Sequence, residues 1–277
     1  MKCPNCGANI ANETQLCPKC GVFVRFDGAR SDSGLENNRK MLAAAGETSL
    51  ALGKKARMER LNADYSDSRF LSDRAYNAVI IGVLLYGIIL NVILCMRVGD
   101  IYNYISPGAF LLLYLVCAIA GIILSAKSHN PAVSFLGYNL VAVPLGLAIS
   151  TLVAMYGGIG SKVVTMAFVY TGLICIGMLG AAVAFPELFK KLGGALFGCL
   201  IGLFVCEILL LIFRVNQDIT DWFAAGLFSL YIGYDVYRSQ QFAKTIDNAI
   251  DCALDIYLDI ANLFIRILSI LSKKNRD

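Results

Sequence analysis

Long apolar runs separated by short polar breaks fill the chain from residue 78 onward. A helix needs about 17 to 25 residues to cross a hydrocarbon core of about 30 Å. We predict that the following runs form membrane helices: Ala78–Met96, Ala109–Ala126, Pro131–Tyr156, Val163–Phe185, Leu192–Phe213, Trp222–Tyr237 and Cys252–Leu271. The pattern therefore predicts an all-α polytopic membrane protein with a bundle of seven transmembrane helices.

The breaks between the runs contain residues that end helices or form tight turns, namely Pro107–Gly108, Asn130–Pro131, the glycine-rich segment 157–160 and Pro186. Within the fifth run, Gly194, Gly198 and Gly202 recur every four residues. Small residues at this spacing let a neighbouring backbone approach closely in a membrane. We therefore expect another helix to pack against this face.

Composition supports the membrane interpretation. Hydrophobic residues make up 57% of the chain and charged residues 16%, whereas soluble domains have about 25% charged residues. A soluble globular protein is excluded on this basis, and the lipid bilayer is the expected surrounding of residues 74–277.

The first 25 residues carry a different pattern, in which a Cys-Pro-x-Cys-Gly knuckle occurs twice. Cys3, Cys6, Cys17 and Cys20 supply four thiolates at a spacing that can surround one Zn²⁺ ion tetrahedrally. Disulfide pairing is the alternative, but a reducing cytosol and the duplicated knuckle favour the metal. We predict a small zinc ribbon at residues 1–25, which depends on its structural metal for folding.

Few basic residues accompany this module, and the net charge of the whole chain is only +4. A phosphate-tracking surface needs more, so we expect no nucleic acid as partner. Contact with another protein is the preferred role of the ribbon, and a structural cap is the alternative. Residues 26–73 are rich in Ser, Asn, Gly and charge, which predicts a flexible basic linker.

The chain opens on this polar segment and not on a charged-then-apolar leader. We therefore expect the N-terminus to lie in the cytosol, and the bias of Lys and Arg between the predicted loops agrees. A bacterial plasma membrane is the expected location. The last run contains charged residues, so a re-entrant segment is an alternative to a full span there.

Acidic residues lie inside the last two apolar runs, with Asp235 in the sixth and Asp255 and Asp259 in the seventh. Ionised side chains in hydrocarbon are costly, so they usually face a bundle interior, a water-filled cavity or an ion path. Steps of three and four residues place one polar face on the seventh helix, made of Asp251, Asp255, Asp259, Asn262 and Arg266.

Such a polar face needs partners, and Asp235 on the sixth helix and Glu207 on the fifth are candidates. Two carboxylates close together in a low dielectric cannot both ionise easily, so the pair titrates as a coupled unit and can sense protons. The alternative is structural: Arg266 and the tyrosines Tyr231, Tyr234 and Tyr257 satisfy the acids.

The segments Gly233-Tyr234-Asp235-Val236-Tyr237-Arg238 and Ala253-Leu254-Asp255-Ile256-Tyr257-Leu258-Asp259-Ile260-Ala261-Asn262-Leu263-Phe264 resemble the paired signature of the Bax inhibitor-1-like family of seven-helix membrane proteins. The resemblance implies that Asp235 and Asp259 form a hydrogen-bonded pair that senses pH and gates a calcium leak, closed while the pair is intact. Two features depart from the family pattern. Asp255 is an extra acid, and no arginine occurs between Ala109 and Ala126 in the second helix.

Two classes of function remain open. The first is a pH-sensitive cation leak, with Ca²⁺ as the permeant ion and Asp235, Asp255, Asp259, Glu207 and Arg266 along its path. The second is a non-conducting membrane regulator that contacts a protease or another membrane complex through its zinc ribbon. An enzyme is not expected. His129 is the only histidine, and Asp259 lacks the Gly-x-Gly-Asp context of intramembrane aspartyl proteases.

Overall fold

The computed structural model describes residues 9, 70–128, 130–213 and 218–274. The four cysteines predicted to bind zinc, and the predicted linker up to residue 69, lie outside these residues. The predicted ribbon therefore stays a prediction.

All regular structure in the described chain from residue 70 onward is helical. Its elements are α3 (Asp73–Arg97), the 3-10 helix η1 (Ile101–Asn103), α4 (Pro107–Lys127), α5 (Pro131–Met155), α6 (Lys162–Ala184), α7 (Pro186–Phe213), α8 (Asp218–Ser239) and α9 (Ile246–Lys274). Each of the seven predicted runs falls within one α-helix, apart from a residue at two ends. The all-helical class is confirmed.

Local capping explains where several helices begin. The side chains of Ser72, Asn130 and Ser161 accept hydrogen bonds from backbone N–H groups in the first turns of α3, α5 and α6, and so satisfy donors that the helix leaves without partners. Gly157 and Gly158 have φ of 92° and 80° between α5 and α6, a backbone conformation that glycine adopts without a steric penalty. The predicted breaks are confirmed at these positions.

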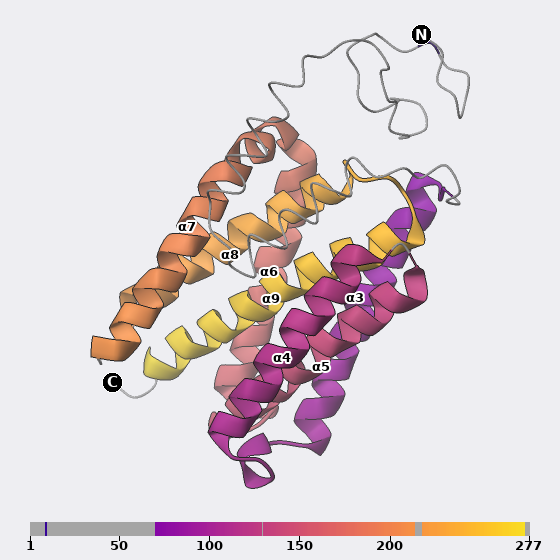
Figure 1. Ribbon diagram of the computed structural model, residues 1–277. Helices are drawn as coiled ribbons and strands as arrows, with labels where there is room; N and C mark the ends of the chain where they lie inside the picture. The colour runs from indigo at the N-terminus through magenta and orange to yellow at the C-terminus, as the bar shows by residue number, and fades with distance from the viewer. Residues whose placement is uncertain (1–8, 10–69, 129, 214–217, 275–277) are drawn as a thin grey trace.

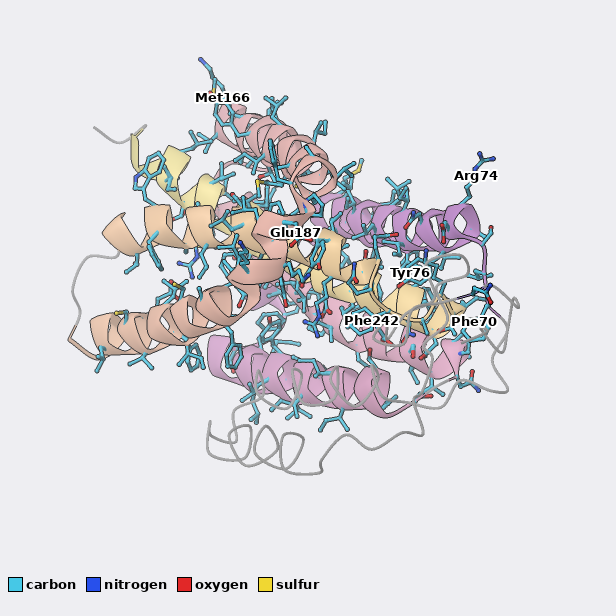
Figure 2. The ribbon with its side chains drawn as sticks, turned by 90° about the horizontal axis from the view of Figure 1, so that it is seen from above. Phe70, Arg74, Tyr76, Met166, Glu187 and Phe242 are labelled. Carbon is cyan, nitrogen blue, oxygen red and sulfur yellow. The ribbon has the colours of Figure 1, made fainter. Side chains whose placement is uncertain are left out.

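In the part of the chain that the structure describes, four helices are long and apolar enough to cross a membrane: α3, α5, α6 and the Pro186–Glu207 part of α7. In α4 the apolar stretch Leu112–Ser125 is shorter. Large apolar side chains lie exposed on these helices, including Ile176 at 69% and Val183 at 81%. Exposed apolar surface of this extent is typical of a lipid contact. Figure 2 shows Met166 pointing outward from the bundle. The protein is therefore an integral membrane protein.

Helix α9 occupies the interior of the bundle. Figure 1 shows it running between α7 and α8 on one side and α3, α4 and α5 on the other, and it packs against α3, α5, α6 and α8. Tyr257, Leu263 and Leu268 are each no more than 1% exposed. The helix with the most acidic residues is thus enclosed by the more apolar helices, which face lipid.

The buried residues form two hydrophobic clusters. The larger one joins α5, α6, α7, α8 and α9. The smaller one lies where the start of α3 meets the α8–α9 connection and the first half of α9, and it contains Tyr76, Ile80, Phe242, Ala249, Cys252, Ala253 and Ile256. The α8–α9 hairpin is thus packed separately at the end where its two helices are joined.

Glycine packing differs from the prediction for α7. A Cβ atom at Gly194, Gly198 or Gly202 would meet nothing within 4 Å, so the expected helix contact at this face is wrong for the described chain. Close approaches occur instead in α3 and α5. A Cβ at Gly87 would lie 2.0 Å from the Tyr138 hydroxyl, and one at Gly146 would lie 2.4 Å from Asn91 Oδ1. These glycines make room for side chains and not for a backbone.

Candidate functional site along α9

The polar residues of α9 contact several different helices along its length. Near its start, Ser134 of α5 donates a hydrogen bond to Asp247, and Ser125 of α4 donates one to Asp251. All four side chains are buried. Hydrogen bonds to ionised groups are stronger than those between neutral groups, so these serines stabilise acids in the interior.

A glycine contact brings the two serines to the same place. A Cβ at Gly121 of α4 would lie 2.6 Å from the Gly137 carbonyl of α5, and a Cβ at Gly137 would lie 3.2 Å from Ser125 Cβ. Larger residues would separate α4 from α5. The close approach therefore lets both helices present a hydroxyl group to α9.

The middle of α9 is held by a tyrosine. The Tyr257 hydroxyl donates to Asn91 Oδ1 of α3 at 3.0 Å, and the Ala142 carbonyl of α5 lies 3.3 Å from it. Tyr257 also packs against the ring of Tyr138, with the ring centroids 5.6 Å apart. Of the tyrosines predicted to satisfy the acids, Tyr257 thus contacts an amide and a backbone carbonyl.

The acids that the resemblance singled out lie inside the bundle. Asp235 is 6% exposed and Asp259 is 8% exposed, on two helices that pack along each other. Asp255 is half-buried. The carboxylates therefore experience the low dielectric of the interior.

Near the end of α9, Arg266 joins three helices. Its guanidinium lies 2.5 Å from Glu207 Oε1 of α7 and 2.9 Å from Asp221 Oδ1 of α8. Ser269, three residues further along α9, donates to Asp221 Oδ2 at 2.8 Å. The structure therefore brings together Glu207 and Arg266, which the sequence had placed on facing helices.

Several partners in these contacts were not predicted, among them Asp221, Ser125 and Ser134. Asp221 lies just before the predicted sixth run, which began at Trp222. An antiparallel hairpin places the start of α8 level with the end of α9, and this rule could have directed attention to an acid opposite Arg266. Ser125 and Ser134 carry no comparable signal, because serines are ordinary residues in membrane helices.

The site along α9 combines buried carboxylates with hydroxyl groups and one guanidinium. Groups of these kinds can bind, move or sense charge. Among residues 9, 70–128, 130–213 and 218–274, no group of three or more His, Cys, Asp and Glu side chains is arranged to hold a metal ion.

Comparison with known proteins identifies the domain. Residues 68–276 match the model of the family described as inhibitor of apoptosis-promoting Bax1. The chain belongs to the Bax inhibitor-1-like family. The matched region contains every helix from α3 to α9, whereas the Cys3–Cys20 segment precedes it. The family domain and the cysteine motif are thus separate parts of the chain.

A relative from Campylobacter jejuni, the uncharacterised protein Cj0236c, is 35% identical to this Bax inhibitor-1-like chain over 132 residues. The match covers 47% of this chain and 54% of the relative. The chain thus matches about half the length of that relative.

Proposed function

We propose that this Bax inhibitor-1-like protein is a pH-sensitive cation leak, with Ca²⁺ as the permeant ion and Asp235 and Asp259 as its gate. The observation that carries the proposal is the burial of both carboxylates on α8 and α9, which pack along each other. Intramembrane acids are expensive and usually functional. The resemblance of the segments around Asp235 and Asp259 to the family signature implies the same two residues.

The chemistry of a carboxylate pair supplies the gate. With one shared proton, two carboxyl groups form a hydrogen bond and hold α8 against α9. When both are ionised, like charges in a low dielectric repel each other, and the helices separate at this level. The ionised oxygens then offer hard ligands to a passing Ca²⁺ ion. Asp255 adds a negative charge one turn before Asp259 on the same face.

The test is Ca²⁺ flux into proteoliposomes at about pH 5 to 8, the range in which physiological switches operate. The full chain is compared with Asp235→Asn, Asp259→Asn and the control Glu187→Gln, an acid 76% exposed at the start of α7. We expect flux that depends on pH in the full chain and in the control, and a loss of that dependence in either aspartate variant. Absence of flux from folded, inserted protein at every pH would refute the leak.

The second candidate is a non-conducting regulator that contacts a protease or another membrane complex through its N-terminal module. The favouring observation is that the family match begins at residue 68, so the Cys3–Cys20 segment is an addition to the family domain. In this proposal the four thiolates hold one structural zinc ion. The test is a pull-down in which binding is lost in Cys3→Ser but kept in Asp259→Asn; binding that ignores Cys3→Ser contradicts it. Metal content measured on the same two proteins checks the zinc.

We place the N-terminus in the cytosol of a bacterial cell, with the α8–α9 connection on the same side. The bias of Lys and Arg supports this orientation. Protease protection of an N-terminal tag in spheroplasts tests it, and cleavage from outside would reverse the orientation.

A further inference from the structure

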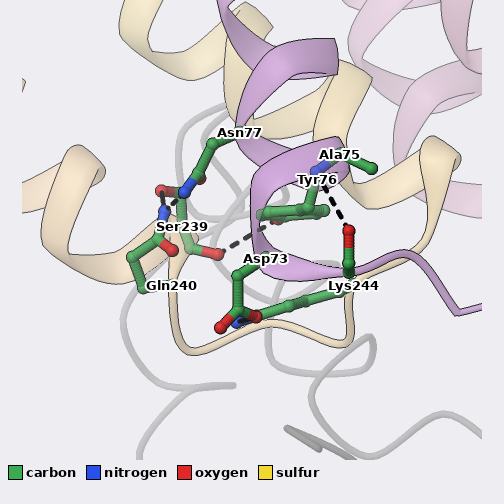
Figure 3. A network of polar contacts seen from close by, with 8 residues as sticks. Asp73, Ala75, Tyr76, Asn77, Ser239, Gln240 and Lys244 are labelled. Carbon is green, nitrogen blue, oxygen red and sulfur yellow. Dashed lines mark hydrogen bonds and ion pairs between the residues drawn. The ribbon is translucent and has the colours of Figure 1, made fainter.

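The start of α3 contacts the connection between α8 and α9 through a set of residues that we name the α3 clasp. On the α3 side it consists of Leu71, Asp73, Tyr76 and Asn77, and on the other side of Ser239, Gln240, Lys244 and Cys252. Figure 3 shows most of these residues meeting at one end of the bundle.

Tyr76 is the centre of the α3 clasp. Its hydroxyl donates to the Ser239 carbonyl at 3.1 Å and lies 3.4 Å from Cys252 Sγ. Ser239 is the last residue of α8, so its carbonyl is one of those that the helix leaves without an internal partner. Because a hydroxyl has one proton, the Cys252 thiol completes the arrangement as a donor to Tyr76. One buried side chain of α3 thus caps α8 and contacts α9.

Polar contacts around Tyr76 attach the rest of the connection. The Leu71 N–H donates to the Lys244 carbonyl at 2.8 Å, and Gln240 Nε2 donates to Asn77 Oδ1 at 2.8 Å. Lys244 also forms an ion pair with Asp73. The smaller hydrophobic cluster, with Tyr76 and Phe242, packs beneath these contacts. The connection is therefore held at both its ends by the start of α3.

The two residues that Tyr76 contacts lie on the helix faces that carry the proposed gate. Ser239 is one helical turn from Asp235 on α8, and Cys252 is two turns from Asp259 on α9. In the other direction, residues 1–69 join the membrane domain at Phe70, directly before the α3 clasp.

We propose that Tyr76 is a positioning residue that fixes the α8–α9 hairpin against α3, so that displacement of the start of α3 moves the helices that carry Asp235 and Asp259. The expected effect on the leak rests on the function proposed above. The contact between Tyr76 and the hairpin is independent of that function.

The first readout is hydrogen–deuterium exchange of a peptide that covers residues 237–247 in the full chain, where the amides of Gln240, Gln241 and Thr245 make turn hydrogen bonds. Tyr76→Phe keeps the ring and removes the hydroxyl. We expect exchange about fivefold faster, the factor that corresponds to one net hydrogen bond. Gln240→Ala, at an exposed position, is the milder second variant, with an increase of about twofold.

The matched control is Tyr138→Phe. Tyr138 is equally buried, and its hydroxyl also donates to a backbone carbonyl, that of Val83 at 3.2 Å, but it does not touch the connection. Exchange in residues 237–247 should be unchanged in this variant. Equal exchange in Tyr76→Phe and Tyr138→Phe would overturn the proposal.

The second readout is Ca²⁺ flux at one fixed pH, and we expect the leak of Tyr76→Phe to change about as much as its exchange rate. Faster exchange with unaltered flux, while Asp235→Asn alters flux, would overturn the link to the gate and leave the leak standing. If the full chain conducts nothing, the leak fails, and the exchange comparison still decides whether Tyr76 fixes the hairpin.

Discussion

The acids at the two ends of α9 have different kinds of partner. At its start, Asp247 and Asp251 accept hydrogen bonds from the neutral hydroxyls of Ser134 and Ser125. At its end, Glu207 and Asp221 share the guanidinium of Arg266. A carboxyl group can gain a proton beside a hydroxyl without breaking an ion pair, whereas protonation beside a guanidinium abolishes one.

The difference assigns separate roles to the two ends. The end with Arg266 ties α7, α8 and α9 together through ion pairs. The end with the serines lies beside the α8–α9 connection, where the α3 clasp also attaches. Asp235 and Asp259 belong to the hairpin between these ends, so a change in their charge acts on helices anchored at both sides.

The largest expected effect comes from removal of the guanidinium. Arg266→Gln removes the guanidinium that pairs with the buried Asp221 and the half-buried Glu207, and the loss of one partner of a buried pair costs about 3 to 5 kcal/mol. The free energy of unfolding of the variant, measured in mixed micelles, gives this loss. Lys190→Gln is the control, because Lys190 pairs with Glu187 at 3.8 Å on the surface, where pairs contribute about 0 to 1 kcal/mol. Equal losses in both variants would show that the Arg266 pairs contribute no more than surface pairs do.

The next effect concerns the middle of α9. Gly87→Ala would place a Cβ 2.0 Å from the Tyr138 hydroxyl and 3.0 Å from the Tyr257 ring, and overpacking of this kind costs about 1 to 3 kcal/mol. Gly82→Ala is the control on the same helix, since nothing lies within 4 Å of its Cβ. The same unfolding measurement applies. A tolerated Gly87→Ala would mean that Tyr257 is not held tightly between the two ends.

An effect of similar size is expected at the start of α9. Ser125→Ala removes the donor to Asp251, and a buried polar group that loses a partner costs about 1 to 3 kcal/mol. Ser229→Ala is the control, because the Ser229 hydroxyl donates to the Ala225 carbonyl of its own helix. If Ser125→Ala cost more than Arg266→Gln, the comparison between the two ends would be reversed.

The smallest effect belongs to the surface of the α3 clasp. Lys244→Gln removes the ion pair with Asp73. The Lys244 side chain is 13% exposed, but that of Asp73 is 76% exposed and its charge is screened by water, so we expect a loss of about 1 kcal/mol or less. The loss should shrink further in salt, because exposed charges are screened. Unfolding at two salt concentrations measures it, and a large, salt-independent loss would contradict a surface role.

Much of the fold could be predicted, because hydrophobic runs of membrane length and their helix-breaking borders are local properties of the chain. The polar face of α9 was also readable, since helical spacing places Asp251, Asp259 and Arg266 on one side. The residues that these polar side chains contact could not be predicted. Asp221 lies 45 residues from Arg266, and its role depends on the register of the hairpin. The glycines of α7 show the same limit, since their spacing predicted a contact that the described chain does not make.

By itself, the sequence determined the membrane environment, the positions of the helices and the presence of acids in the last two, because hydropathy and periodicity act along the chain. Only the tertiary structure decided that α9 lies in the interior, that hydroxyl groups serve its start and a guanidinium serves its end, and that Tyr76 joins α3 to the α8–α9 hairpin. These contacts connect residues far apart in the chain. Their formation depends on close approaches such as that of Gly121 and Gly137, which no local pattern encodes.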